Sequence, residues 1–544
     1  MPDPDMKKRR LEAAHRKRRI ILNTDAGSVH DGDPAHPERF LDRRITGLHE
    51  THVDAIAFCT DYAFNHYTQN STVTEIVNYR GTPDDPAPDI IQGLIKKGTD
   101  TIEVATNYCH DNGMEIFWSM RMNDEHDSWI PPAVPQWKKD HPQCLFGTES
   151  KRPPHGAWTG VDYAQEAVRD QVLAIFHDVC SRYDVDGIDL DYFKDPTCFK
   201  SMAWGHPVTD EERDAMTDML RRIRQMTDDI GRQRGRPLLI SARVPDSPSF
   251  AHTIGLDFER WMAEDLIDIH VATGYFRLQP WERTIELGHR HQVVVYPCLE
   301  LSRVCEHRRP DRTEPPKVRR LNESFRAEAL KMWNAGADGI YMFNFHYFHP
   351  THQLWRQLGD PEALRPLNKI YFVSMMGKGH NDLNHYLPTG DRFIHIPMLC
   401  PDHAVELYPG EPLSTTIMIG DDLQSRDAPK HRPTVKLNIR LEPLARSGDL
   451  TVRLNGHELS PAALTWTVEA YRAALARTYE GMTGATDQPV EDTDDIWRQW
   501  GEFEVKAETL KAGSNSIDIE LSGDPKAPCL ILDVQLRIDY EQGS

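Results

Sequence analysis

Two aspartates separated by a single leucine stand in an apolar segment of this chain. The segment reads Val185-Asp186-Gly187-Ile188-Asp189-Leu190-Asp191-Tyr192-Phe193. In a strand, alternate side chains point to opposite faces, so Asp189 and Asp191 would share one face and Leu190 would take the other. Two inward carboxylates are costly to bury without partners. The end of a strand in a (β/α)8 barrel is the usual place for such a pair, and a structural pair that caps loops or binds an arginine is the alternative.

Further polar residues stand where other apolar runs end, and barrel enzymes place their chemistry at such ends. We expect one site built from these residues: Asp25, Asp61, Arg121, Asn123, Asp124, His126, Asp189, Asp191, Tyr192, Arg243, Tyr275, Glu300, Asn344 and His346. Trp129 and Trp158 lie in a Pro-rich insertion at 124–160 and are expected to present aromatic faces to a sugar. A second, basic insertion at 303–320 is expected at the same rim.

The residue types limit the chemistry that this site can perform. The barrel segment shows no serine nucleophile elbow, no phosphate-binding glycine loop and no strand lysine suited to a Schiff base. The first strand ends in Asn23 and Asp25, where a metal-dependent barrel hydrolase would carry two histidines, so neither a metal nor another cofactor is predicted. Carboxylates with an arginine, amides and aromatic rings are the set that glycoside hydrolysis uses.

The segment at 186–196 resembles a known motif. Its sequence, Asp-Gly-Ile-Asp-Leu-Asp-Tyr-Phe-Lys-Asp-Pro, is similar to the strand-four motif of bacterial glycosyl-hydrolase-like TIM barrels, the family 10-like group. The resemblance loosely covers the chain as far as residue 350, and it implies glycosidic-bond hydrolysis with Asp191 as a catalytic carboxylate. The motif is also similar to that of chitinase-type barrels, but Phe193 stands where those have their glutamate, which excludes a chitinase mechanism on that residue.

The second catalytic carboxylate is expected to be Glu300. Similarity to the large clan of retaining barrel glycosidases implies an acid/base on strand four and a glutamate nucleophile on strand seven, so Asp191 and Glu300 form the predicted pair, with the two roles exchangeable. Asp189 lies deeper and is expected to disfavour ionisation of its neighbour. Arg121 and Arg243 would neutralise Asp189, bind a substrate carboxylate or sulfate, or hold the barrel mouth together. In the alternative, Glu300 is only a rim residue, and Asp124, Glu125 or Asp127 supplies the second catalytic carboxylate.

The elements that position these residues follow from the hydrophobic pattern. Short apolar runs alternate with longer amphipathic stretches up to residue 350, which is typical of parallel βα units. The predicted strands are 20–25, 55–61, 115–123, 187–192, 238–244, 267–275, 293–300 and 339–346, and predicted helices include 163–183, 211–234 and 322–335. Eight such units predict a TIM barrel at 18–365.

After residue 365 the pattern changes to short strands with turn residues between them. Strands are predicted at 393–396, 414–419, 435–441, 450–454, 501–505, 516–521 and 529–539, with a hairpin at Asn455-Gly456 and a helix at 466–479. This pattern predicts an all-β sandwich at 366–544, accessory to the chemistry.

Composition bounds the partners and the location of the protein. The formal net charge of −21 over 544 residues argues against nucleic acid as the main partner. Nine scattered cysteines without a CxxC pair indicate reduced thiols. Residues 1–17 are basic, lack the apolar core of a secretory signal and are expected to be a disordered tail. No apolar run is long enough to span a bilayer, so a cytoplasmic protein without membrane partners is expected, or a secreted one if its natural N-terminus is missing.

These observations together predict a glycoside hydrolase that acts on a poly- or oligosaccharide, with retention of configuration favoured over inversion. Two alternatives stay open: a barrel that binds carbohydrate without cleaving it, and a lyase or isomerase that uses the same carboxylates for proton transfer on a uronate.

Overall fold

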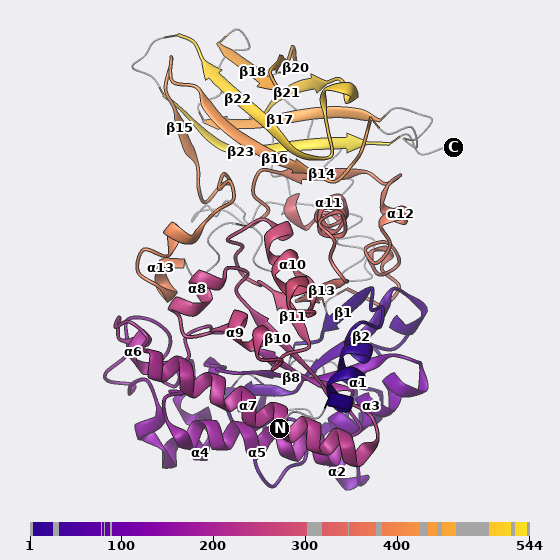
Figure 1. Cartoon of the computed structure of the whole chain (residues 1–544), viewed down its shortest axis with the longest axis vertical. Coiled ribbons are helices and arrows are strands. Elements are labelled where there is room, and N and C mark those ends of the chain that lie inside the picture. The colour runs from indigo at the N-terminus through magenta and orange to yellow at the C-terminus, as the bar shows by residue number, and fades with distance from the viewer. Residues whose placement is uncertain are drawn as a thin grey trace. The chain divides into compact units, whose positions relative to one another are not determined.

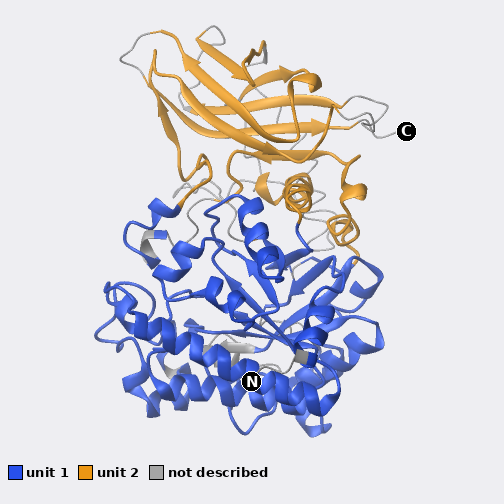
Figure 2. Cartoon of the chain, in the orientation of Figure 1, with its two compact units in different colours: residues 1–300, 337–350, 380–393 blue, residues 301–336, 351–379, 394–544 orange. Residues whose placement is uncertain are grey.

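The computed structural model describes most of the chain. The described residues are 4–25, 32–77, 79–80, 82–86, 90–301, 318–345, 348–376, 383–424, 433–442, 449–463, 500–523 and 528–540. They fall into two compact units (Figure 2). The first contains 1–300, 337–350 and 380–393, and the second contains 301–336, 351–379 and 394–544. The division therefore differs from a simple boundary at residue 365.

A closed barrel of eight parallel strands forms the centre of the first unit (Figure 1). Its strands, in spatial order, are β1 (Ile20–Asn23), β2 (Val53–Cys59), β8 (Glu115–Arg121), β9 (Gly187–Asp191), β10 (Leu239–Val244), β11 (Ile269–Ala272), β12 (Val294–Glu300) and β13 (Ile340–Phe343), and β13 pairs with β1 to close it. All eight predicted barrel strands are confirmed. Several of them end one to three residues earlier than predicted.

The register between neighbouring strands decides which side chains meet inside the barrel. Asp189 on β9 is paired with Ser119 on β8 and Ser241 on β10. One step further along the inward face, Asp191 is paired with Arg121 and Arg243. Successive inward residues on three adjacent strands therefore form a hydroxyl-rich layer and, above it, a layer of charges.

Helices follow most of the barrel strands along the chain. Those of the first unit are α2 (Ile90–Lys96), α3 (Thr101–Asp111), α4 (Gln136–Asp140), α5 (Glu166–Arg182), α6 (Lys200–Ala203), α7 (Asp210–Arg234), α8 (Pro248–Thr253), α9 (Phe258–Ala263), α10 (Trp281–Arg290) and α13 (Leu383–Tyr386). Helix α7 begins at a capping box made by Thr209 and Glu212 and ends at Gly235 with φ of 74°. Such a box satisfies orphan N–H groups and is worth about 1 kcal/mol.

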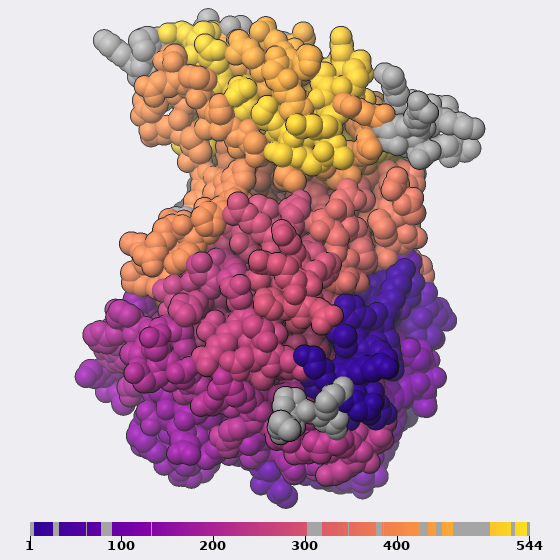
Figure 3. Space-filling view, viewed as in Figure 1, coloured from indigo at the N-terminus to yellow at the C-terminus, as the bar shows by residue number. Residues whose placement is uncertain are grey.

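The N-terminal segment differs from the expected tail. Residues Pro4–Ala14 form α1, and Arg10 in it is 2 % exposed. Its guanidinium pairs with Asp228 at 2.7 Å and Asp268 at 3.2 Å, and it also pairs with Asp265. The space-filling view shows the indigo N-terminal residues seated among the purple and magenta parts of the first unit (Figure 3). The expectation of disorder is wrong for this helix, because its basic residues find carboxylates more than two hundred positions away.

Two small sheets lie in the connection between β2 and α3. One contains β3 (Asp61–Ala63), β4 (His66–Tyr67) and β5 (Glu75–Ile76), and the other contains β6 (Tyr79–Arg80) and β7 (Thr82–Pro86). No described helix is long and apolar enough to cross a membrane.

The second unit is rich in antiparallel strands. One sheet has the order β14 (Lys369–Phe372), β23 (Cys529–Asp539), β17 (Thr434–Glu442), β21 (Trp500–Val505) and β20 (Pro461–Ala463), with β15 (Val405–Leu407) also on β23. The other has the order β16 (Leu413–Ile419), β22 (Gly513–Leu521), β18 (Leu450–Leu454) and β19 (His457–Glu458). Helices α11 (Asn322–Asn334) and α12 (Pro361–Leu364) belong to the same unit, and α11 packs on β14.

Both sheets contribute to one apolar core. Leu437 and Leu536 come from the first sheet, and Ile417 and Ile519 come from the second. The predicted β-rich region after the barrel is confirmed. The strand expected at 393–396 is wrong, since Gly390–Phe393 forms a single 3-10 turn instead. The helix expected at 466–479 lies outside the described residues.

Candidate active site

The carboxyl of Asp189 lies on the inward face of β9 and is 1 % exposed. It accepts hydrogen bonds from the hydroxyls of Ser119 and Ser241, both at 2.8 Å, and of Tyr341 at 2.9 Å. Burial and the nearby charge of Asp191 raise the pKa of Asp189, while the three hydroxyl donors oppose that rise. Asp189 is therefore enclosed by protein donors, which suits a positioning group rather than one that touches substrate.

One layer above, Asp191 is held by Arg243. The guanidinium donates from Nε to Oδ1 at 2.8 Å and from Nη2 to Oδ2 at 2.7 Å. The backbone N–H groups of Phe193 and Lys194 donate to Oδ1 at 2.9 and 3.2 Å. Arg243 is completely buried and its Cζ lies 3.8 Å from the centroid of the Phe343 ring. Both oxygens of Asp191 are thus occupied, which suits a fixed anion better than a group that exchanges a proton.

This pairing corrects one expectation. Arg243 was expected to be able to neutralise Asp189, and it contacts Asp191 instead, because the β9–β10 register places Ser241 opposite Asp189. Arg121, also expected near Asp189, pairs with Asp25 and with Asp124, whose Oδ2 lies 2.7 Å from Nη1. Neither arginine is thus paired with Asp189.

Asp124 is the most strongly held anion at the end of β8. Its Oδ1 accepts from the backbone N–H of His126 at 2.9 Å and lies 2.6 Å from the Nδ1 of that ring. Burial alone would raise the pKa of Asp124, but the charges of His126 and Arg121 outweigh burial and hold that pKa well below its usual range. Asp124 is therefore ionised throughout the physiological pH range.

Asp195, just beyond β9, is the functional candidate that the sequence analysis left without a role. Burial and the negative charge of Asp124 raise the pKa of Asp195 to about 7. Within the described part of the chain, no residue donates a hydrogen bond to its carboxyl group. Asp195 therefore exchanges its proton near neutral pH, which is what a general acid or base requires. It stands in a loop, where neither strand alternation nor helix periodicity could indicate which way its side chain points.

Glu125 adds a third carboxyl group to this cluster. Its Oε2 accepts from the backbone N–H of Ala157 at 2.8 Å, and its buried Oε1 has no hydrogen-bond partner among the described residues. Burial and the charge of Asp195 raise the pKa of Glu125 well above its usual value. A Cβ at Gly160 would lie 2.2 Å from Oε1, which explains why a glycine stands there.

Backbone strain gathers at the same end of the barrel. Thr273 and Asn344 directly follow β11 and β13, and Asp25 lies two residues beyond β1; their φ values are 68°, 64° and 53°. A positive φ is most unusual for a β-branched residue such as Thr273, and each strained residue costs about 1–3 kcal/mol. Glu300, which ends β12, is 3 % exposed and accepts a hydrogen bond from the side-chain amide of Asn344. Strain of this kind clusters at functional sites.

The remaining predicted residues have different positions. Tyr192 is fully buried, its hydroxyl lies 3.5 Å from the sulfur of Met216 on α7, and its ring contacts Trp261 on α9. The expectation that Tyr192 binds substrate is therefore wrong, since the residue after inward Asp191 must point outward. Asn123 is also fully buried, and its amide is used entirely by the backbone of Val161 and Thr197, so it fastens a loop.

Five further aromatic or polar residues were predicted to lie in the site. Tyr275 is buried and its ring contacts those of Phe193 and Phe343. Trp158 is partly buried, whereas Trp129 is 74 % exposed. The side chain of Asp61 and the whole of His346 lie outside the described residues.

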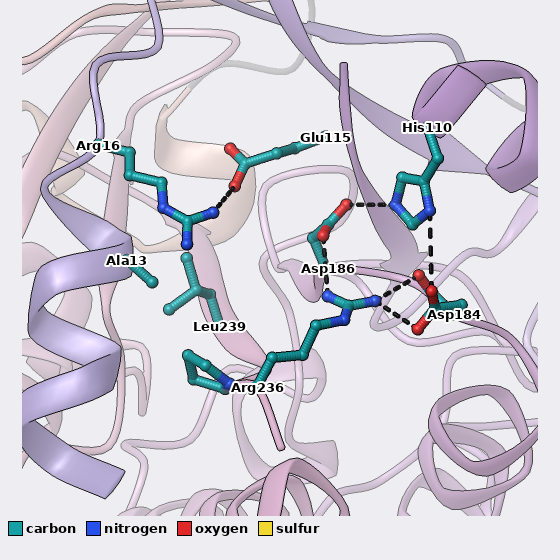
Figure 4. Close-up of a pocket in the computed structure, with 9 residues that line it drawn as sticks. Ala13, Arg16, His110, Glu115, Asp184, Asp186, Arg236 and Leu239 are labelled. Carbon is teal, nitrogen blue, oxygen red and sulfur yellow. Dashed lines mark hydrogen bonds and ion pairs between the residues drawn. The ribbon is translucent and has the colours of Figure 1, made fainter. Parts of the chain in front are cut away.

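A cavity of about 240 Å³ lies at the opposite, N-terminal end of the barrel strands. It is lined by Ala13, Arg16, His110, Glu115, Asp184, Asp186, Arg236, Pro237 and Leu239. Figure 4 shows Arg236 and His110 each directed at both Asp184 and Asp186, while Arg16 pairs with Glu115. Its charged groups are thus paired with one another, which is typical of the stabilising end of a barrel.

Comparisons with known proteins add a fold-level likeness. No family model matches the chain and no curated protein matches it. The chain is similar to the glycoside hydrolase domain of PgaB (BpsB) from Bordetella bronchiseptica, with 11 % identity, a TM-score of 0.37, and coverage of 60 % of this chain and 94 % of that one. It is also similar to alpha-L-fucosidase isoenzyme 2 from Paenibacillus thiaminolyticus, with 11 % identity, a TM-score of 0.39, and coverage of 97 % and 100 %.

A third similar structure is a GH27 β-L-arabinopyranosidase from Geobacillus stearothermophilus, with 11 % identity, a TM-score of 0.38, and coverage of 94 % of this chain and 98 % of that one. These solved structures are glycoside hydrolases of several kinds. All three TM-scores are below 0.5.

Proposed function

We propose that this protein hydrolyses glycosidic bonds in a poly- or oligosaccharide. The observation that carries the proposal is the pair formed by Asp124 and Asp195, at the C-terminal ends of the adjacent strands β8 and β9. Arg121 and His126 keep Asp124 ionised, whereas Asp195 titrates near neutral pH. When the surroundings of two neighbouring carboxyl groups separate their pKa values, one group can act as a proton donor while the other stays ionised.

Asp195 is assigned the proton transfer in this proposal. Its protonated carboxyl would donate to the glycosidic oxygen as the bond breaks, and the carboxylate would then take a proton from water. The fixed anion Asp124 would stabilise positive charge on the sugar ring and keep the proton on Asp195. The reaction consumes only water, so the proposal requires no cofactor.

Glu300 is assigned the second catalytic carboxylate. It ends β12, which stands four strands from β8 around the closed barrel and therefore across it. As a nucleophile it would give retention, and as a base that activates water it would give inversion. Asp189 and Asp191 then act as positioning residues, Asp191 through its ion pair with Arg243. The motif resemblance instead makes Asp191 itself catalytic, and the variants described in the Discussion separate these two assignments.

The test is product analysis with the purified full-length protein and a panel of defined neutral and uronate-containing saccharides. New reducing ends without ultraviolet absorbance indicate hydrolysis. An unsaturated, absorbing product would indicate a lyase, and binding without any product would indicate a carbohydrate-binding barrel. Asp195→Asn should slow the formation of new reducing ends by about 10²–10⁴-fold. Asp218→Asn is the matched control, because Asp218 is 62 % exposed on the surface of α7.

A further inference from the structure

Trp129 has an exposure that is unusual for its type. Its side chain is 74 % exposed, and among the large hydrophobic residues that the structure describes only Tyr408, at 39 %, is also exposed. Tryptophan is highly buried on average, because exposing its large apolar surface is unfavourable. A single exposed apolar residue does not need an explanation by itself. The segment that presents Trp129, however, is held by several buried interactions.

Trp129 is the last residue of the short 3-10 turn η4 (His126–Trp129), and buried interactions hold this turn in place. Asp127 pairs with Lys138 at 2.8 Å, and both side chains are completely buried. The other oxygen of Asp127 accepts from the hydroxyl of Thr159 at 2.7 Å. The indole N–H of Trp158 donates to the carbonyl oxygen of Ser128 at 3.1 Å. A loop tip with few such contacts would be poorly ordered. The contacts of Asp127 and Ser128 instead fix the backbone next to Trp129.

The indole is also connected to the proposed catalytic cluster. The Trp129 and His126 rings meet edge to face, with centroids 5.4 Å apart and an interplanar angle of 73°. The same imidazole lies 2.6 Å from Asp124. One histidine ring therefore separates the exposed indole from Asp124, the carboxylate whose charge raises the pKa of Asp195.

We propose that Trp129 is a stacking platform for a sugar ring next to the one whose bond is cleaved, so that the substrate is a chain of several sugars rather than a glycoside of a single sugar. This inference rests on the proposed function and names its substrate class. A flat indole matches the C–H face of a pyranose ring. A protein partner fits less well, because a stable protein interface buries about 1,200–2,000 Å² and one exposed ring offers a small fraction of that area.

The test compares wild type with Trp129→Ala and Trp129→Phe, using cello-, chito-, xylo- and manno-oligosaccharides from disaccharide to hexasaccharide. Loss of one aromatic platform should lower kcat/KM on the longest cleaved substrates by about threefold to tenfold. The shortest cleaved substrate should be unaffected, and Trp129→Phe should recover most of the loss. Tyr408→Ala, the matched control at the other exposed aromatic residue, should behave as wild type. An equal loss on every chain length, or none on any, would overturn the platform.

Calorimetric binding separates this inference from the proposed function. Titration of the same oligosaccharides into Asp195→Asn, with and without Trp129→Ala, measures the platform without turnover. If no saccharide is cleaved but long chains bind and lose affinity by about threefold to tenfold with Trp129→Ala, hydrolysis is wrong and the platform stands. If saccharides are cleaved and Trp129→Ala binds all chain lengths as tightly as its parent, hydrolysis stands and the platform is wrong. Absence of binding by any member of the panel also overturns the platform.

Discussion

Arg243 and Asp191 face each other across the β9–β10 pair, joined by two hydrogen bonds of 2.8 and 2.7 Å in the interior of the barrel. Asp191 is 1 % exposed and Arg243 is fully buried. An isolated charge at this depth is costly, so each residue needs the other to stay where it is. The aspartate that the strand-four motif indicates is therefore first of all the partner of a buried arginine.

Removal of that partner should affect stability as well as activity. We expect Asp191→Asn to lower the free energy of unfolding by about 3–5 kcal/mol, because it leaves Arg243 buried without a counter-charge. Chemical denaturation measures this loss. The double variant Asp191→Asn/Arg243→Met should recover part of it. A stable but inactive Asp191→Asn protein would instead support a direct catalytic role for Asp191.

The pH dependence of activity should report Asp195. As a proton donor with a pKa of about 7, it is competent below that value, so kcat/KM should fall as the pH rises through about 7. Asp195→Asn should lower kcat by about 10²–10⁴-fold and remove this alkaline limb. An alkaline limb that survives in Asp195→Asn at nearly full activity would assign the proton transfer elsewhere.

The free energy of unfolding should also depend on pH through Asp195. The pKa of Asp195 in the folded protein is raised above its ordinary value of 3.8 to about 7, so the folded state binds more protons than the unfolded state between these two values. Stability is therefore lost as the pH rises through that window. We expect Asp195→Asn to melt at a higher temperature than wild type at pH 8 and at nearly the same temperature at pH 3. Equal melting temperatures at both pH values would contradict the raised pKa.

Chemical rescue should define the role of Glu300. If it is the nucleophile, Glu300→Ala should lose turnover, and azide should restore it with a glycosyl azide of inverted configuration as product. Asn344→Ala, which removes the amide donor to Glu300, is expected to weaken activity without creating azide dependence. Full activity of Glu300→Ala without azide would transfer the role to another carboxylate.

Helix α1 should be required for stability. Arg10→Ala leaves Asp228 and Asp268 buried without their arginine partner in α1, and we expect a loss of about 3–5 kcal/mol in the free energy of unfolding. Lys8→Ala is the control on the same helix, because the Lys8 side chain is 74 % exposed and its pairing with Glu12 spans 3.9 Å in solvent. Similar effects of the two substitutions would contradict a structural role for α1.

Local patterns predicted the barrel well, because each strand is a short apolar run whose alternation is visible in the sequence. The same alternation correctly predicted that Asp189 and Asp191 point inward. The partner of each, however, depends on the register between strands, which cannot be read from the sequence of one strand. Arg243 was for that reason expected to neutralise Asp189. The helix at Pro4–Ala14 was missed because the carboxylates around Arg10 come from distant segments.

The loops were the least predictable part of the site. Asp195 lies beyond the end of β9, where neither strand alternation nor helix periodicity applies. Its raised pKa arises from burial and from Asp124, which lies beyond the end of the neighbouring strand β8. Asn123 has the same polar character in the sequence as a substrate-binding amide, but three backbone groups occupy it. The residue type alone does not show whether an asparagine binds substrate or holds a loop through backbone hydrogen bonds.

Hydrolysis in water enriched in the heavy oxygen isotope tests the central claim most directly. The purified full-length protein is incubated with the saccharide panel, and the masses of the products are measured by mass spectrometry. We expect one labelled oxygen at each new reducing end with wild type, and formation of new reducing ends that is about 10²–10⁴-fold slower with Asp195→Asn. Unlabelled or unsaturated products, no cleavage of any saccharide, or undiminished cleavage by Asp195→Asn would contradict it.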